Sequence, residues 1–167
     1  MKPERIHLPA MLLGGVSFYG DPFSQKSGWD SENEIGKTCA RFITYTQQNP
    51  QRPYSCGRNV ICEIHVYGEE TNTKGYFEVF VGEEVNTARL PVPLSVKHLP
   101  ESDYIKIELH GQEITDDWWQ ALDTEILPKF HARRNATYII QAYDARFKGM
   151  ERLDDSVIDV YIPVETA

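Results

Sequence analysis

Membrane-spanning segments and metal-type cysteine motifs are both missing from this sequence. No apolar run approaches the roughly 20 residues that a membrane helix needs, and the charged start of the chain does not form a signal peptide. The three cysteines form neither a Cys-x-x-Cys pair nor a zinc-type arrangement with the five histidines. We therefore expect a protein of the cytoplasm with reduced thiols, no metal and no cofactor.

Basic residues are too few for a nucleic-acid-binding surface. Lysine and arginine number 17 against 25 aspartates and glutamates, which gives a formal net charge of −8. Binding to a phosphate backbone relies on Lys and Arg. The sequence also contains no phosphate-binding glycine loop, no nucleophile elbow and no recognisable Ser/His/Asp group. We therefore expect no direct nucleic-acid partner, and these motifs assign no catalytic residue.

The composition is that of an ordinary globular protein. Hydrophobic residues make up 41% and charged residues 25% of the 167 positions, which is enough apolar material for a sizeable core. We therefore expect residues 1–167 to form a single domain.

An internal repeat is the most informative feature of the chain. Three short segments of alternating polarity recur in the same order in the two halves, and a helical pattern follows the first segment of each half. The matched segments are residues 16–21 with 107–112, 64–68 with 140–144, and 77–81 with 158–162. The simplest interpretation is an α+β fold of two strand-helix-strand-strand halves around a pseudo-twofold axis, with a pocket on that axis.

The first half carries recognisable start signals for its elements. We expect a strand over residues 5–19, and then a helix from Ser31, which would form a capping box with Glu34. Strands over residues 60–67 and 76–81 would form a hairpin through a polar turn. The apolar face of the helix comprises Ile35, Cys39, Phe42 and Ile43.

A proline-rich linker separates the halves. Residues 87–99 would be an extended connection between halves of about 1–86 and 100–167, because prolines cannot donate ladder hydrogen bonds. In the second half, Thr115 would cap the helix. The remaining strands are expected over residues 104–109, 137–143 and 157–164.

Several loose motifs, taken in order and spacing, resemble one family over nearly the whole chain. They comprise residues 76–85, Leu99-Pro100 followed by Tyr104 and Gly111, Leu127-Pro128, residues 143–147 and the closing residues 160–164. Together they are similar to the GyrI-like, or AraC effector-binding, domains. The nearest in style are stand-alone versions, including those carried on integron cassettes.

The resemblance implies a fold and a ligand class. In such proteins two sheets enclose a pocket lined by aromatic and aliphatic side chains, often with one buried acid. The ligands are typically flat, hydrophobic and frequently cationic, which suits aromatic faces and a desolvated carboxylate. The resemblance thus implies a hydrophobic or cationic small molecule as the partner, no membrane, and, for a module without a DNA-binding extension, a protein partner such as a regulator.

The family's acid falls on Gln141 in this sequence, two residues before Tyr143. We expect both side chains to line the pocket, since residues two apart share a strand face. The repeat places His65 in the position of Gln141, and Glu63, His65 and Tyr67 share a face. Glu63 is either a displaced carboxylate of the pocket or a solvent-facing residue.

Four further residues complete the candidate ligand-binding set. Tyr104 is near the pocket by family position or is a core tyrosine. Trp118 and its neighbour Trp119 cannot share a helical face, so one packs inside and the other shields a rim. Cys39 stands where relatives often have a tryptophan, and Phe42 lies on the same helical face. The full set is Gln141, Tyr143, Tyr104, His65, Tyr67, Glu63, Trp118, Cys39 and Phe42.

Two classes of function follow. The first is a small-molecule-binding module that acts as a sensor, a sequestering protein or an effector-binding partner. The second is an enzyme, because some GyrI-like relatives hydrolyse cyclopropane-bearing toxins in this pocket. Such chemistry needs a base, and with Gln141 in place of the usual acid only His65 or Glu63 could supply it.

Overall fold

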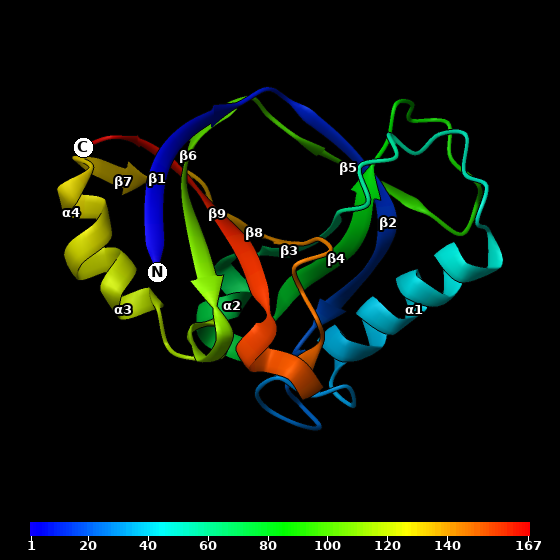
Figure 1. The fold of residues 1–167 in the computed structure, drawn as a ribbon, viewed down its shortest axis with the longest axis horizontal. Helices are drawn as coiled ribbons and strands as arrows, with labels where there is room; N and C mark the ends of the chain where they lie inside the picture. The colour runs from blue at the N-terminus through cyan, green and yellow to red at the C-terminus, as the bar shows by residue number, and fades with distance from the viewer.

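A computed structural model describes residues 1–167, and it consists of one curved antiparallel sheet with helices against it (Figure 1). The strand order is β1-β6-β9-β8-β3-β4-β2-β5, and β7 pairs with β9 outside this path. The strands are β1 (Lys2–Leu8), β2 (Met11–Gly20), β3 (Ile61–Val66), β4 (Phe77–Glu84), β5 (Ser95–Leu99), β6 (Ser102–His110), β7 (Ala132–Arg134), β8 (Tyr138–Tyr143) and β9 (Val157–Thr166).

The helices are few and mostly short. They are α1 (Glu34–Gln48), α2 (Glu69–Lys74), α3 (Trp119–Ala121) and α4 (Leu127–Lys129), with a π turn at Leu122–Ile126 and 3-10 turns at Gly111–Ile114 and Met150–Asp155. None of them combines the length and the apolar character that a membrane-crossing helix requires.

The strand order is symmetric about the centre of the sheet. Strands β3 and β8 lie side by side, with Ile64 opposite Ile140, and β4, β2 on one side mirror β9, β6 on the other. The predicted α+β fold with two related halves is confirmed, but the halves share one continuous sheet and not the two sheets that the resemblance implied. At the two edges the halves exchange strands, because β1 pairs with β6 and β5 pairs with β2.

Two expectations about connections are wrong. The linker at residues 87–99 is not a simple extended connection, because Val92 and Pro93 form a turn and the last residues pair in the sheet as strand β5. Pro91 and Pro93 precede that strand and Pro100 follows it, so none of them removes a ladder hydrogen bond. The polar turn between β3 and β4 is helix α2, which ends at Gly75 in the left-handed conformation that suits glycine.

The second helix also starts later than Thr115 predicts. A 3-10 turn covers Gly111–Ile114, residues 115–118 are not helical, and the hydroxyl of Thr115 donates to the carbonyl of Gln112. The π turn ends next to Pro128, which has no N–H to continue the regular ladder.

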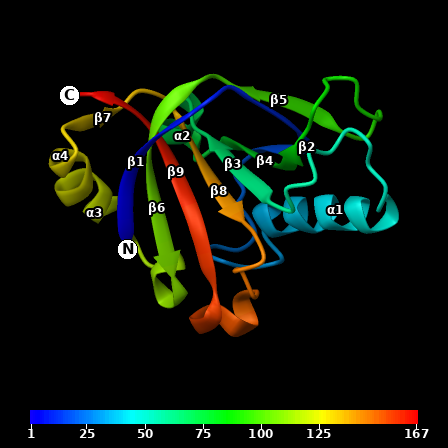
Figure 2. The same cartoon turned by 45° about the horizontal axis from the view of Figure 1, so that its top comes forward.

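The core divides between the two faces of the sheet. Helix α1 packs through Phe42 on β2 and β4, and α3–α4 packs through Leu122 and Ile126 on β6 and β9. The opposite face is filled by a third cluster that includes Ile64 and Phe80. Figures 1 and 2 show α1 and α3–α4 at opposite ends of the sheet, with the centre of the sheet between them. A site can therefore form over β3 and β8.

Helix α1 begins at Glu34 and is capped by Asn33 rather than by Ser31. The Asn33 Oδ1 atom accepts from the Gly36 N–H at 3.0 Å, and its Nδ2 donates to the Gly28 carbonyl at 2.8 Å. Only 1% of Asn33 is exposed, so both bonds are shielded from water. The cap therefore ties the preceding loop to the helix.

Replacing Asn33 with alanine should lower the free energy of unfolding by about 1–2 kcal/mol, because a cap is lost and buried backbone groups lose their partners. Urea unfolding measures the change. The matched control is Ser31→Ala, which removes the sequence-based cap candidate and should change stability by less than about 0.5 kcal/mol. Equal losses in the two variants would contradict the assignment of the cap.

Candidate functional site

A cavity of about 760 Å³ lies between α1 and the centre of the sheet. Its floor comes from β3, β4 and β8, one wall from α1, and its rim from the loop before α1 and the segment after β8. Its lining consists of Phe23, Gly28, Trp29, Asp30, Ser31, Asn33, Ile35, Gly36, Cys39, Ile43, Ile61, Glu63, His65, Val81, Gln141, Tyr143, Phe147, Met150 and Glu151. We call it the α1 pocket.

A buried carboxylate lies on the floor of the α1 pocket. Only 4% of Glu63 is exposed, so the solvent-facing alternative is excluded. Its Oε1 atom accepts from Nε2 of His65 at 2.7 Å and from Nε2 of Gln141 at the longer distance of 3.5 Å. Its Oε2 atom accepts from the Tyr143 hydroxyl at 3.3 Å and from Sγ of Cys39 at 3.4 Å. All its neighbours here are donors.

The strand register explains this cluster. In the antiparallel pairing of β3 with β8, Glu63 lies directly opposite Gln141. Directly opposed residues project on the same face of a sheet, and so do residues two apart on one strand. His65 and Tyr143 therefore join them. The buried carboxylate of this cluster therefore lies on the strand next to that of Gln141, the position at which the resemblance implies an acid.

The α1 pocket disfavours further negative charge. Burial, reinforced by the Glu63 carboxylate, raises the pKa of the Tyr143 hydroxyl well above its ordinary value, and the same two causes raise the pKa of the Cys39 thiol. Both groups therefore stay neutral, which argues against Cys39 as a nucleophile. Asp30 and Glu151 add acidic groups to the rim, and no Lys or Arg belongs to the lining.

Aromatic rings form the rim. The Trp29 and Phe147 rings both meet Tyr143 edge-on, at centroid distances of 6.5 and 5.0 Å. Trp29 is 41% exposed, as is typical of a side chain at a pocket mouth. Phe23 contacts Phe77, which in turn lies 5.2 Å from the His65 ring. A flat apolar ligand entering this pocket would meet ring faces and edges above the carboxylate.

The structure brings five of the nine candidate residues into the α1 pocket. They are Glu63, His65, Gln141, Tyr143 and Cys39.

The other four candidates lie elsewhere. Phe42 is buried in the cluster beneath α1. Tyr104 lies on the opposite face of the sheet, where its hydroxyl is 2.8 Å from that of Tyr138. Trp118 is in the core, stacked on Trp119. Tyr67 directly follows β3, with its hydroxyl 3.4 Å from Nδ1 of His65, and it lines a different pocket.

Many of the residues that sequence reasoning missed come from loops and a 3-10 turn, and others, such as Ile35, Ile61 and Val81, come from α1, β3 and β4. Phe23 and Asn33 precede α1, and Phe147, Met150 and Glu151 follow β8. Phe147 closes one of the motifs that carried the family resemblance, which was the one available signal. Periodicity cannot assign loop residues to a pocket. No group of three His, Cys, Asp or Glu side chains is arranged to hold a metal ion.

Comparisons with known proteins agree with this fold. The family model described as "integron-associated effector binding protein" matches residues 6–164. No curated protein matches the chain. Among solved structures, it is similar to SAV2435 bound to tetraphenylphosphonium, with a TM-score of 0.69 and 12% identity over 99% of this chain and 94% of that one.

Two other similar structures have different descriptions. An integron cassette protein from Vibrio cholerae gives a TM-score of 0.58 and 13% identity, over 98% of this chain and 95% of that one. A hydrolase from Listeria innocua gives a TM-score of 0.55 and 16% identity, over 98% of this chain and 92% of that one. Identities this low show a shared fold.

Proposed function

The chain belongs to the integron-associated effector binding proteins, and we propose that it binds flat hydrophobic cations in the α1 pocket. The GyrI-like resemblance of the sequence is confirmed by this family. Effector-binding proteins take small molecules, and a volume of about 760 Å³ is within the range of small-molecule sites. The solved structure of SAV2435 with tetraphenylphosphonium supports a hydrophobic cation as the ligand.

The observation that carries the proposal is the buried Glu63 carboxylate. It lies on the floor of an aromatic-rimmed pocket, and no Lys or Arg contributes to the lining. A desolvated carboxylate loses much of its hydration energy, and a ligand cation that enters the pocket restores a favourable partner. The ring faces of Trp29 and Tyr143 add attraction for the same charge.

This chemistry suits a sensor or a sequestering protein. Ligand binding at the mouth would involve the loop before α1, which contributes Trp29 and is anchored through Asn33. A change in that loop could be detected by a partner protein such as a regulator.

The charge of the ligand provides the direct test. We expect 10-methylacridinium to bind at least about tenfold more tightly than neutral acridine, because the two rings have almost the same shape and only one carries a charge. Isothermal titration calorimetry at mildly alkaline pH, where acridine is neutral, measures both affinities. Equal affinities would contradict a cation site, and no binding of either would contradict the α1 pocket as an aromatic site.

Hydrolysis in the same pocket is the second candidate function. The observation that favours it is the His65–Glu63 pair at 2.7 Å, since a histidine oriented by a carboxylate can accept a proton from water. Incubation with cyclopropane-bearing compounds, followed by mass spectrometry of the products, tests it. Turnover by the wild-type protein that disappears in His65→Gln would establish an enzyme. If the wild-type protein leaves the compounds unchanged, binding is the function that remains.

A further inference from the structure

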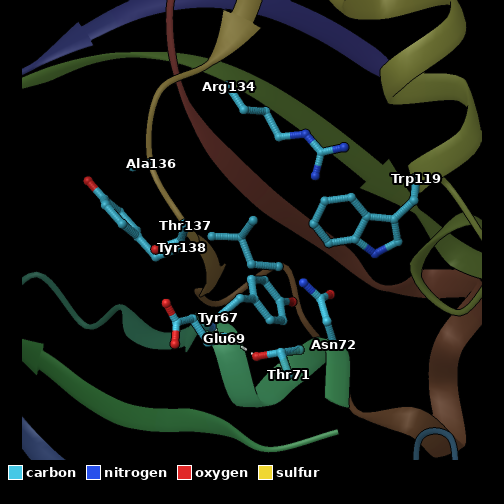
Figure 3. A pocket seen from close by; sticks show the side chains of 11 residues that line it. Tyr67, Glu69, Thr71, Asn72, Trp119, Arg134, Ala136, Thr137 and Tyr138 are labelled. Carbon is cyan, nitrogen blue, oxygen red and sulfur yellow. Dashed lines mark hydrogen bonds between the residues drawn. The ribbon is translucent and has the colours of Figure 1, made fainter. Parts of the chain in front are cut away.

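A second pocket, of about 740 Å³, lies beyond Tyr67, between α2 and the helical segment that begins at α3 (Figure 3). It is on the same face of the sheet as the α1 pocket, because Tyr67 follows Glu63 and His65 at two-residue spacing. We call it the α3 pocket. The two pockets occupy related places in the two halves.

Two aromatic rings meet edge to face in the α3 pocket. The Trp119 and Tyr67 rings are 6.4 Å apart at an angle of 74°. Trp119 is held in place by stacking on Trp118 at 4.5 Å, and Trp118 is 8% exposed within the core. One face of Trp119 is thus covered by Trp118, and the rest of the ring is held in place as a surface for a flat ligand ring.

A guanidinium group lies over the Trp119 ring. The Arg134 guanidinium carbon is 5.3 Å from the centre of the Trp119 ring, and Figure 3 shows the group reaching across the pocket toward that ring. Its Nη2 atom donates to both carboxylate oxygens of Asp123. Its Nε and Nη1 atoms have no hydrogen-bond partner within the protein. These two N–H groups of the Arg134 guanidinium are therefore available to a ligand. Their side-by-side arrangement matches the oxygens of a carboxylate or sulfonate.

The two pockets present different groups to a ligand. The α3 pocket contains one basic residue, Arg134, whose charge is offset by its ion pair with Asp123, and one exposed acid, Glu69 on α2. Its distinctive groups are the unpaired N–H donors of Arg134, which bind anionic oxygens. The α1 pocket contains the buried Glu63 carboxylate and no Lys or Arg. The two sites should therefore select different ligands.

We propose that the α3 pocket is a second ligand site, which binds flat aromatic compounds that carry a carboxylate or sulfonate. The ring of the ligand lies against Trp119 beside Tyr67, and its anionic group accepts hydrogen bonds from Nε and Nη1 of Arg134. This site goes beyond the cation site proposed above, because both the cavity and the ligand class are different.

Naphthalene-2-sulfonate and its neutral analogue naphthalene-2-sulfonamide test the proposal. An NMR titration that follows the tryptophan indole N–H signals reports both affinities. We expect the sulfonate to shift the Trp119 signal. In Arg134→Gln its affinity should fall about tenfold, because charge-assisted hydrogen bonds are lost, while the affinity of the sulfonamide changes less than about twofold.

Two variants serve as controls. Arg133→Gln removes the adjacent arginine, which pairs with Glu165 outside the pocket, and should leave the sulfonate affinity unchanged. Glu63→Gln, in the α1 pocket, should also leave it unchanged.

The proposal is overturned if the sulfonate does not bind the wild-type protein, if Arg134→Gln binds it normally, or if Glu63→Gln alone changes its affinity. If Arg134→Gln does not fold, Arg134→Lys replaces it as the test variant. Lysine keeps the positive charge but lacks the planar set of N–H donors, so the affinity for the sulfonate should fall severalfold. The sulfonate affinities of these variants can be measured whether or not the α1 pocket binds a cation.

Discussion

Replacing Glu63 with glutamine should weaken the binding of 10-methylacridinium by about 30-fold or more and leave the affinity of neutral acridine nearly unchanged. Glutamine keeps the size of the side chain and removes its charge, so the loss isolates the buried carboxylate. Truncating one partner of a buried charge pair costs about 2–5 kcal/mol, and 2 kcal/mol corresponds to about 30-fold in affinity. Isothermal titration calorimetry measures both ligands in both proteins.

The control for this prediction is another acid of the same pocket. Glu151→Gln removes a charge at the exposed rim, where solvent screens it, and should lower the affinity for 10-methylacridinium by less than about threefold.

A rescue variant provides a further test. Because Gln141 lies directly opposite Glu63, the double variant Glu63→Gln with Gln141→Glu moves the carboxylate to the neighbouring strand.

Cation binding should return in that double variant. Gln141→Glu alone would place two carboxylates side by side, where their repulsion opposes ionisation of both, so it should gain little. Normal cation binding by the single variant Glu63→Gln would show that the ligand's charge is not recognised at Glu63.

Shortening Ile64 to alanine should lower the free energy of unfolding by about 3 kcal/mol. Ile64 is fully buried at the centre of the sheet, opposite Ile140, and packs in the cluster that contains Phe80 and Tyr104. The lost methyl and methylene groups leave a cavity that strands paired on both sides cannot close. Urea unfolding followed by circular dichroism measures the change.

The matched control is an exposed aliphatic residue. Val92 is 99% exposed in the loop before β5, so Val92→Ala should change stability by less than about 0.5 kcal/mol. A small loss in Ile64→Ala, similar to that of Val92→Ala, would show that the centre of the sheet can collapse around the gap.

The repeat allowed most of the sheet to be predicted, and it could have shown more. His7-Leu8-Pro9 recurs as His98-Leu99-Pro100, in register with the match of residues 16–21 to 107–112. Each tripeptide ends the edge strand of its half, β1 or β5. The prolines around β5 led to the prediction of a linker, although proline is tolerated at strand ends. Extending the repeat to these tripeptides would have identified β5 as the equivalent of β1.

The candidate site was only partly predictable. Strand alternation grouped Glu63 with His65, and Gln141 with Tyr143, correctly. It could not tell which face of the sheet holds the pocket, because both faces are apolar and buried, and Tyr104 lies on the other face. The position of Trp29 depends on how a loop of glycine, proline and serine folds over the sheet, and such a loop has no period to read.

The exchange of β1 and β5 between the halves makes the two repeats topologically intertwined. Each half lends its first strand to the edge of the other. A half-length ancestor could complete the same pairings only as a domain-swapped dimer, with one copy lending its strand to the next. For the present chain, the halves are therefore not subdomains joined by a hinge. If the chain were cut in the loop before β5, the two fragments would stay associated through the pairing of β1 with β6 and of β5 with β2, and would not separate as independent units.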